Sequence, residues 1–213
     1  MNIKTVIFDL DGTIANTLPL CIAAFKKSIE PLLGAEISER EIMATFGPSE
    51  EGTIRKLIPQ QEEAGVKSYL KYYEALHHTC AAPFDGIKEL LQFLEDKGVQ
   101  LAMLTGKGIH STKISLRQFD LDRYFKVLET GSPEGPDKVN GIKRAIKRLN
   151  ADTDKCIYVG DAPSDILAAK EAGIPIASVA WAETTDAKEL LPLNPDWIFY
   201  SVAEFKTWIT NFI

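Results

Sequence analysis

Short apolar runs and longer amphipathic stretches alternate along most of this chain. Apolar runs rich in β-branched or aromatic residues occur at 6–8, 99–104, 126–129, 156–159, 176–180 and 197–200. Such runs are typical of strands buried on both faces of a parallel sheet. Amphipathic stretches separate them, for example residues 87–97, which end at Gly98. The alternation predicts an α/β fold, with a Rossmann-like parallel sheet covered by helices on both faces.

Residues 16–82 depart from this alternation, because they contain helical patterns and no convincing strand. The expected helices lie at residues 19–33, 38–46, 52–57 and 62–79. Ser38 and Glu41 form a capping box at the start of the second helix, and the pair Gly47-Pro48 and Pro59 indicate turns. We therefore predict a small all-helical cap domain at residues 16–82, inserted into a core domain made of residues 1–15 and 83–213.

A second capping box, Ser201 with Glu204, predicts the start of the last helix. The apolar side chains of that helix repeat at helical spacing, and we expect them to pack against the sheet rather than stack on a ligand. They are Phe205, Trp208, Ile209 and Phe212.

Cysteine and histidine give no metal-binding pattern. Cys21, Cys80 and Cys156 are odd in number and widely spaced, which predicts reduced thiols, with Cys156 buried in a strand. His77 and His78 are adjacent, so on a helix they point in different directions, and we expect ordinary polar helix residues.

Charge and hydropathy limit the possible partners. With 24 basic and 30 acidic side chains the formal charge is −6, and no run of Lys or Arg stands out, which disfavours nucleic acid or an anionic membrane as a partner. No apolar stretch approaches the roughly 20 residues that span a bilayer, and no secretion signal precedes the first strand. We therefore expect a cytoplasmic protein, and the sequence leaves monomer and homodimer both open.

Two carboxylates follow the first apolar run directly. Asp9, Asp11 and Gly12 are poor strand formers, so the strand is expected to end near Asp9 and present both acids at its carboxyl edge, where open α/β sheets bind ligands. A simple Asx-type turn is the alternative. Two nearby acids in unlike surroundings can divide the roles of nucleophile and general acid.

Polar groups follow later strands in the same way. Thr105 comes after residues 99–104, Asp161 comes after residues 156–159, and Lys138 opens a helix. A carboxylate that approaches a phosphate is repelled by about 4 kcal/mol per charge pair at ~4 Å, so an intervening cation is needed. Carboxylates and water suit Mg²⁺ at such a site, and the absence of nearby His or Cys makes zinc improbable.

The segment Asp9-Leu10-Asp11-Gly12-Thr13 resembles the DxDGT signature of the haloacid dehalogenase-like hydrolase superfamily. Thr105, Lys138 and residues 160–165 occur in the order of that family's other motifs. The chain is most similar to phosphatases of the phosphoglycolate phosphatase type, which carry a helical cap of the C1 kind. This resemblance implies a Mg²⁺-dependent phosphatase that acts on a small phosphorylated metabolite through an aspartyl-phosphate.

Each matching residue receives an expected role. Asp9 is the nucleophile, and Asp11 is the general acid and base. Thr105, with the amide of Gly106, donates hydrogen bonds to phosphate oxygens. Lys138 neutralises charge on Asp9 and on the phosphoryl group.

The resemblance also implies a ligand set for the metal: the side chains of Asp9 and Asp161 and the backbone carbonyl of Asp11. Asp165 is expected just behind these ligands, and Pro163 in the first turn of the same helix. For the phosphate-site lysine, Lys107 and Lys143 remain competitors of Lys138, whose following residue departs from the Pro common in relatives.

The cap loop at residues 46–51 is expected to face the site. Gly47 and Pro48 would then contact the substrate, with Arg55 and Lys56 beyond them, whereas an ordinary interhelical turn is the alternative. Two other functions also remain open. They are a phosphosugar mutase similar to β-phosphoglucomutase, built on the same core, and a phosphate-binding protein without turnover.

Overall fold

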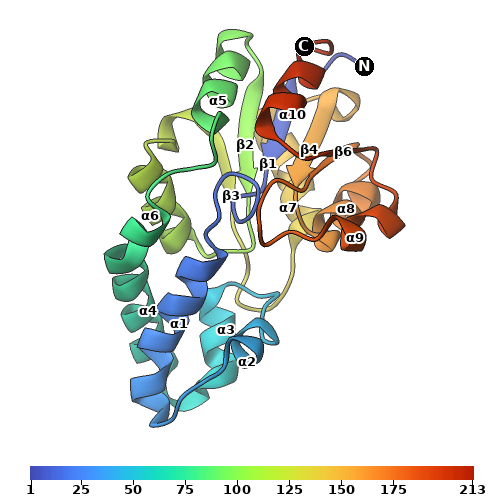
Figure 1. The fold of residues 1–213 in the computed structure, drawn as a ribbon. Coiled ribbons are helices and arrows are strands. Elements are labelled where there is room, and N and C mark those ends of the chain that lie inside the picture. The colour runs from blue at the N-terminus through green and yellow to red at the C-terminus, as the bar shows by residue number, and fades with distance from the viewer.

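The computed structural model describes residues 1–213 and contains one parallel sheet of six strands, in the order β3-β2-β1-β4-β5-β6 (Figure 1). The strands are β1 (Thr5–Phe8), β2 (Gln100–Leu104), β3 (Val127–Glu129), β4 (Cys156–Gly160), β5 (Ile176–Val179) and β6 (Trp197–Phe199). Each expected strand is therefore present, and its ends agree with the expectation to within one residue.

Strand β1 lies between β2 and β4, with Val6 opposite Leu101 on one side and Ile157 on the other. Its side chains alternate between the two faces of the sheet. Val6 and Phe8 belong to one apolar cluster, and Ile7 belongs to the cluster on the opposite face. Because all three are fully buried, β1 is the centre of a core with two covered faces.

Helices cover both faces, which confirms the predicted α/β class. The cluster of Val6 includes side chains from α5 (Ile87–Asp96), α6 (Ile109–Phe119) and α10 (Val202–Ile209). The cluster of Ile7 includes side chains from α7 (Lys138–Leu149), α8 (Pro163–Ala172) and α9 (Ala187–Leu190). Phe205 and Ile209 of α10 are fully buried, and Trp208 and Phe212 pack at the edge of the same cluster, as their spacing predicts.

Four further helices form a separate layer below the sheet in Figure 1, and we call this layer the cap. They are α1 (Leu18–Leu33), α2 (Glu39–Met43), α3 (Glu50–Leu57) and α4 (Glu62–Leu76). Their apolar faces form a third cluster, in which Tyr69 and Tyr73 are the largest fully buried side chains. Their positions agree with the helical stretches expected at residues 16–82, while the division into two domains stays a prediction.

The chain leaves the core and returns to it at neighbouring points, since the amide of Phe84 donates to the carbonyl of Ile14 at 2.9 Å. Single 3₁₀ turns complete the fold at Pro59–Gln61, His77–Cys80, Asp122–Tyr124, Thr153–Lys155 and Leu191–Leu193.

The two predicted capping boxes have different outcomes. At α2 the box is complete: the amide of Glu41 donates to Ser38 Oγ, and the amide of Ser38 donates to Glu41 Oε2. At α10 the amide of Glu204 donates to Ser201 Oγ, but the Glu204 carboxylate accepts from the amide of Tyr200 instead of Ser201. The second box is therefore only half formed, and the Glu204 carboxylate binds the amide of the residue before the N-cap of α10.

One expectation about the histidines was wrong. His77 is only 2% exposed, and its Nε2 lies 3.0 Å from Ser115 Oγ on α6. It lies in the 3₁₀ turn after α4, which directs the ring against the core rather than toward solvent. His78 is exposed, and Cys156 is fully buried as predicted.

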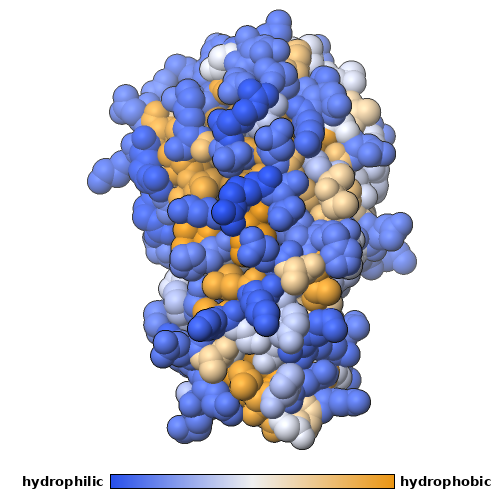
Figure 2. Space-filling model, turned by 90° about the vertical axis from the view of Figure 1, so that its left-hand side faces the viewer, coloured by the Kyte–Doolittle hydropathy of each residue, from blue (hydrophilic) through white to orange (hydrophobic).

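The three cysteines are free thiols, and no helix has the length and apolarity that a bilayer crossing requires. The face in Figure 2 is mainly hydrophilic, with apolar side chains exposed in small patches among polar ones.

Candidate active site

A cavity of about 690 Å³ lies where the carboxyl ends of the strands meet the cap. Its walls combine core residues, such as Asp9 and Thr105, with cap residues, such as Phe25 and Tyr69. Strand β1 ends at Phe8, so Asp9 is the first residue beyond it, and the tight turn at Gly12 follows. Asp9 is only 4% exposed, whereas Asp11 is half-buried.

Lys138, the first residue of α7, brings two of the expected site residues together. Its Nζ lies 3.0 Å from Asp9 Oδ2 and 2.5 Å from Asp165 Oδ1. Asp165 is fully buried and also accepts from the hydroxyl of Tyr158 at 3.0 Å and from the amide of Ala162 at 3.0 Å. These three donors fix Asp165, which in turn holds the lysine against Asp9.

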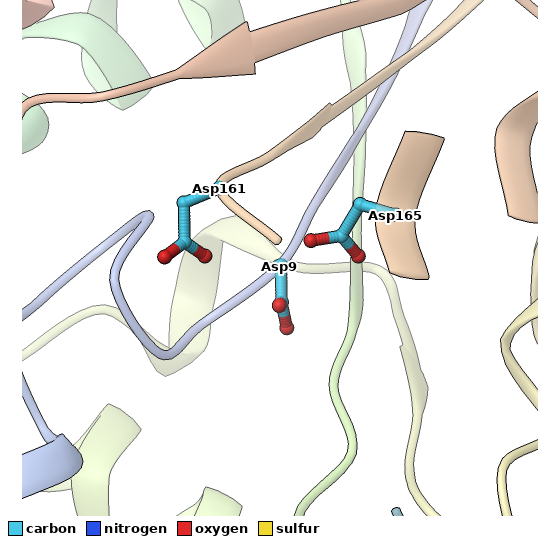
Figure 3. Close-up of side chains that lie close together, drawn as sticks. All are labelled: Asp9, Asp161 and Asp165. Carbon is cyan, nitrogen blue, oxygen red and sulfur yellow. The ribbon is translucent and has the colours of Figure 1, made fainter. Parts of the chain in front are cut away.

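Asp161 follows β4 and lies beside Asp9, with Asp165 on the other side (Figure 3). One carboxylate oxygen from each of these three residues can be chosen so that all lie within 4.8 Å of one another. Asp161 itself accepts from the hydroxyls of Thr13 at 3.3 Å and Thr185 at 2.7 Å. The ends of β1 and β4 and the first turn of α8 thus bring Asp9 together with two acids from a distant part of the sequence.

Burial and mutual repulsion make these acids hard to ionise. Burial, aided by the neighbouring carboxylates of Asp165, Asp11 and Asp161, raises the pKa of Asp9 well above its usual range, although Lys138 opposes the shift. Burial and then Asp165 raise the pKa of Asp161 to about 6. Burial alone would lower the pKa of Lys138, but Asp165 and Asp9 raise it above its ordinary value. One lysine therefore faces an excess of negative charge.

This donor set fits a Mg²⁺ ion. The ligand atoms are carboxylate oxygens, which Mg²⁺ prefers, and a divalent cation would offset the mutual repulsion of the clustered acids. Asp9 and Asp161 would hold the ion, together with the carbonyl of Asp11. Asp165 binds Lys138 and Tyr158 and also lies within the group of three acids, so its place behind the ligands stays a prediction.

The loop after β2 supplies further hydrogen-bond donors to the cavity that Asp9 lines. Thr105 is buried, and its Oγ1 accepts from the amide of Lys107 at 3.2 Å, which leaves the hydroxyl proton free to be donated. The amide of Gly106 has no acceptor within the protein. Both residues line the cavity, so both donors are available to an anion there.

The three candidate lysines lie in different places. Lys138 contacts Asp9, whereas Lys107 is buried and contacts Asp11 at 3.2 Å. Lys143 is exposed at the mouth of the cavity and has no carboxylate partner. The geometry supports Lys138 as the phosphate-site lysine.

The cap loop contributes part of the cavity wall. Gly47 and Pro48 line it, as expected, and so do Phe46 and Glu50. Arg55, which we expected beyond this loop on the same side, instead pairs with Glu62 and Glu134 at 3.0 Å each.

Lys56 was misplaced as well, because its Nζ donates to the carbonyl of Thr45 at 3.3 Å. Neither Arg55 nor Lys56 lines the cavity. Helix α3 directs these two basic side chains to the outer surface, where Arg55 meets the loop that precedes α7.

Several side chains that contact the expected site residues were missed. Thr17 donates to Asp11, Thr13 and Thr185 donate to Asp161, and Tyr158 donates to Asp165. Thr13 and Thr17 lie within a few residues of the first motif and could have been found from that proximity. Thr185 carries no comparable signal, since it lies in a loop after β5 that reaches the site only through the fold.

Gly12 allows Asp161 to approach the first turn, and this is testable. A Cβ at Gly12 would overlap the Asp161 carboxylate, and its φ is +73°. Gly98 has the same φ of +73° with open space around it, so Gly98→Ala is a matched control. Left-handed strain costs about 1–2 kcal/mol in either variant. We expect Gly12→Ala to lose a further 1–3 kcal/mol or so through overpacking, and activity as well.

Thermal unfolding of both variants checks this expectation, with about 2–4 °C in Tm for each kcal/mol at this chain length. Equal losses in the two variants would show that Asp161 does not depend on the space at residue 12.

A parallel sheet with the order β3-β2-β1-β4-β5-β6, an acidic cluster at its carboxyl edge and a layer of helices over that edge place the chain among Rossmann-like α/β proteins whose ligand site lies at the carboxyl ends of the strands. The sequence matches the model of the haloacid dehalogenase-like hydrolase family over residues 6–179. The chain belongs to this family, and it is an enzyme of the phosphatase group.

Curated relatives and solved structures agree with this assignment. A protein named pyrophosphatase PpaX from Halalkalibacterium halodurans is 30% identical, covering 96% of this chain and 95% of that protein. PpaX of Listeria innocua is 31% identical, with coverages of 95% and 94%. A haloacid dehalogenase-like family hydrolase from Streptococcus pneumoniae superposes with a TM-score of 0.78 at 25% identity, covering 97% of this chain and 98% of that one.

Proposed function

We propose that this chain is a Mg²⁺-dependent phosphatase that hydrolyses a small phosphorylated metabolite through an aspartyl-phosphate on Asp9. One observation carries the proposal: Asp9 lies at the cavity with one carboxylate oxygen bound by Lys138 and with Asp161 close by. A binding protein has no need of a carboxylate beside a bound phosphate, because like charges repel. A nucleophilic carboxylate, by contrast, has to lie beside the phosphorus atom that it attacks.

The chain's own residues divide the work. Asp9 attacks phosphorus and forms the acyl-phosphate bond while the bond from phosphorus to the leaving oxygen breaks. Asp11 gives its proton to the leaving oxygen and later takes a proton from the water that hydrolyses the intermediate. Thr105 and the amide of Gly106 donate to the phosphoryl oxygens, and Lys138 neutralises charge that would otherwise oppose the attack.

When bound, Mg²⁺ supplies positive charge between Asp9 and the incoming phosphate, which lowers their repulsion. The carboxylates of Asp9 and Asp161 and the carbonyl of Asp11 would hold it. The carboxylates of Asp9, Asp161 and Asp165 lie close together with Lys138 as the one cation in contact with Asp9, which supports a further cation at this point.

The cavity suggests the size and type of the substrate. Its volume of about 690 Å³ lies within the range usual for small-molecule sites, and its cap wall carries the apolar side chains of Leu18, Phe25 and Phe46. This supports a small phosphomonoester of the phosphoglycolate kind rather than a polymer. Pyrophosphate is a further candidate, because relatives are named pyrophosphatases.

Release of inorganic phosphate tests the proposal. A panel of phosphoglycolate, pyrophosphate, sugar phosphates and nucleotides is assayed with Mg²⁺ and again with a chelator in excess. We expect at least one small substrate to be hydrolysed with Mg²⁺, and we expect the chelator to lower the rate by about 10²-fold or more, since charge neutralisation contributes several kcal/mol.

The two alternative functions give different results in the same assay. A mutase converts a sugar 1-phosphate into its isomer without net release of phosphate. A phosphate-binding protein shows binding and no turnover of any substrate. Either outcome contradicts the proposal.

A further inference from the structure

Lys107 is the most deeply buried cation near the cavity, and the reaction proposed above does not use it. Its side chain is 6% exposed although it belongs to the loop after β2, at the boundary between core and cap. Nζ lies 2.7 Å from Cys21 Sγ on α1 and 4.7 Å from the ring centre of Tyr73 on α4. Two cap helices thus shield this lysine from water.

Asp11 is the one carboxylate within ion-pair distance of Lys107 Nζ, at 3.2 Å from Oδ1. The sulfur of Cys21 does not compete as an anion, because burial raises the pKa of that thiol to about 11. A buried ammonium without a partner is strongly unfavourable, so the lysine is held to Asp11. The cap therefore keeps water away from the contact between Lys107 and Asp11.

The carboxylate of Asp11 is bound on one oxygen only. Lys107 and the hydroxyl of Thr17 both donate to Oδ1, and Oδ2 has no partner within the protein. Asp11 also lines the cavity. Two donors on Oδ1 fix the carboxylate and leave Oδ2 as the oxygen that can exchange a proton with a leaving group.

A second contact fixes the loop beside Lys107. Glu50, at the start of α3 in the cap, is 4% exposed, and its carboxylate accepts from the amide of Gly108 at 2.6 Å and from Ser111 Oγ at 2.6 Å. A Cβ at Gly108 would lie 2.8 Å from Glu50 Oε1, so glycine makes this approach possible. The residue next to Lys107 is therefore anchored by the cap.

We propose that Lys107 is a positioning residue: the cap helices pack around its side chain, and the side chain in turn orients Asp11. Glu50 of the cap anchors the loop on which Lys107 lies. Lys107 holds Oδ1 of the Asp11 carboxyl group, so that the proton which Asp11 carries in the first step lies on Oδ2 and passes to a strongly basic leaving oxygen as the bond from that oxygen to phosphorus breaks. This inference rests on the proposed phosphatase function, and it assigns Lys107 no contact with the substrate.

Leaving-group dependence tests the role. An alkyl phosphate expels an alkoxide and needs the proton from Asp11, whereas p-nitrophenyl phosphate expels a weakly basic phenolate and needs it far less. General acid catalysis contributes about 10²–10⁴-fold, so we expect Lys107→Met to lower kcat for the alkyl phosphate by about 100-fold. For p-nitrophenyl phosphate we expect a loss below about 3-fold, since proton donation contributes little there.

Two further variants complete the experiment. Glu50→Gln keeps the side-chain size but weakens the anchor, and we expect the same selective loss at about 10-fold, a part of the general-acid contribution. If Lys107→Met does not fold, the comparison of the two substrates is made with Glu50→Gln instead. Lys113→Met, an exposed lysine on α6, is the control and leaves both substrates unchanged.

Equal losses of kcat for both substrates, or no loss for either, would overturn the positioning role. A general structural defect gives equal losses, because it does not distinguish leaving groups. If the wild type releases phosphate from neither substrate, the proposed function is what fails. Turnover by the wild type with equal losses in the variants overturns only the role of Lys107.

Discussion

Replacing Asp9 by Asn abolishes phosphate release while the fold is retained. An amide cannot form the acyl-phosphate, so we expect kcat to fall by at least about 10⁴-fold, which corresponds to about 5 kcal/mol of transition-state stabilisation. Stability is expected to be maintained or increased. Burial raises the pKa of Asp9 in the folded state, so its ionisation opposes folding increasingly as the pH rises above the ordinary pKa of 3.8 and fully above the raised pKa, and a neutral amide removes this cost.

The measurement is phosphate release with Mg²⁺, together with thermal unfolding of the metal-free protein at neutral pH. Asp154→Asn, at an exposed acid without side-chain partners, is the matched control and keeps full activity. Turnover that persists in Asp9→Asn would remove Asp9 from the proposed role, because no other group replaces its carboxylate.

Lys138→Met is expected to have the second largest effect, and it acts on rate and stability together. Loss of one preorganised charge contact to the phosphoryl group costs about 10²–10³-fold in kcat. The change also leaves Asp165 fully buried without its cation, and breaking a buried pair in this way costs about 3–5 kcal/mol. Enzyme kinetics and urea unfolding measure the two effects.

A double variant separates them. Lys138→Met with Asp165→Asn removes both charges of the pair, so most of the stability is expected to return while the activity stays low. Lys143→Met, on an exposed turn of the same helix, is expected to be stable and active. If Lys143→Met were inactive and Lys138→Met active, Lys143 would be the phosphate-site lysine and the role proposed for Lys138 would be wrong.

Much of the core could be predicted from local pattern. Val6, Ile7 and Phe8 predict a strand covered on both faces, and that strand lies at the centre of the sheet. The strand order was not predicted, because pairing depends on contacts between residues such as Val6 and Ile157 that are far apart in the sequence. His77 was misplaced for the same reason: its partner Ser115 lies on a helix of the core.

In the candidate site too, local pattern predicts some contacts, and others depend on packing between distant segments. Asp9 and Asp161 each follow an apolar strand directly, and parallel strands end at one edge, so their proximity follows from the pattern. The contact of Lys107 with Asp11 depends on how two cap helices pack, and no spacing in the sequence reports it. Arg55 was misplaced because its partner Glu134 comes from a distant loop.

The hydrogen bond between Phe84 and Ile14 has a wider consequence for how such an enzyme diversifies. Because the intervening segment leaves the sheet layer and rejoins it at neighbouring points, we expect that it can be exchanged for another without a change in strand register. Selectivity and chemistry can then evolve on separate pieces of the polypeptide. Only the few side chains that make contacts between core and cap, such as Lys107 and Glu50, would have to change together with a new inserted segment.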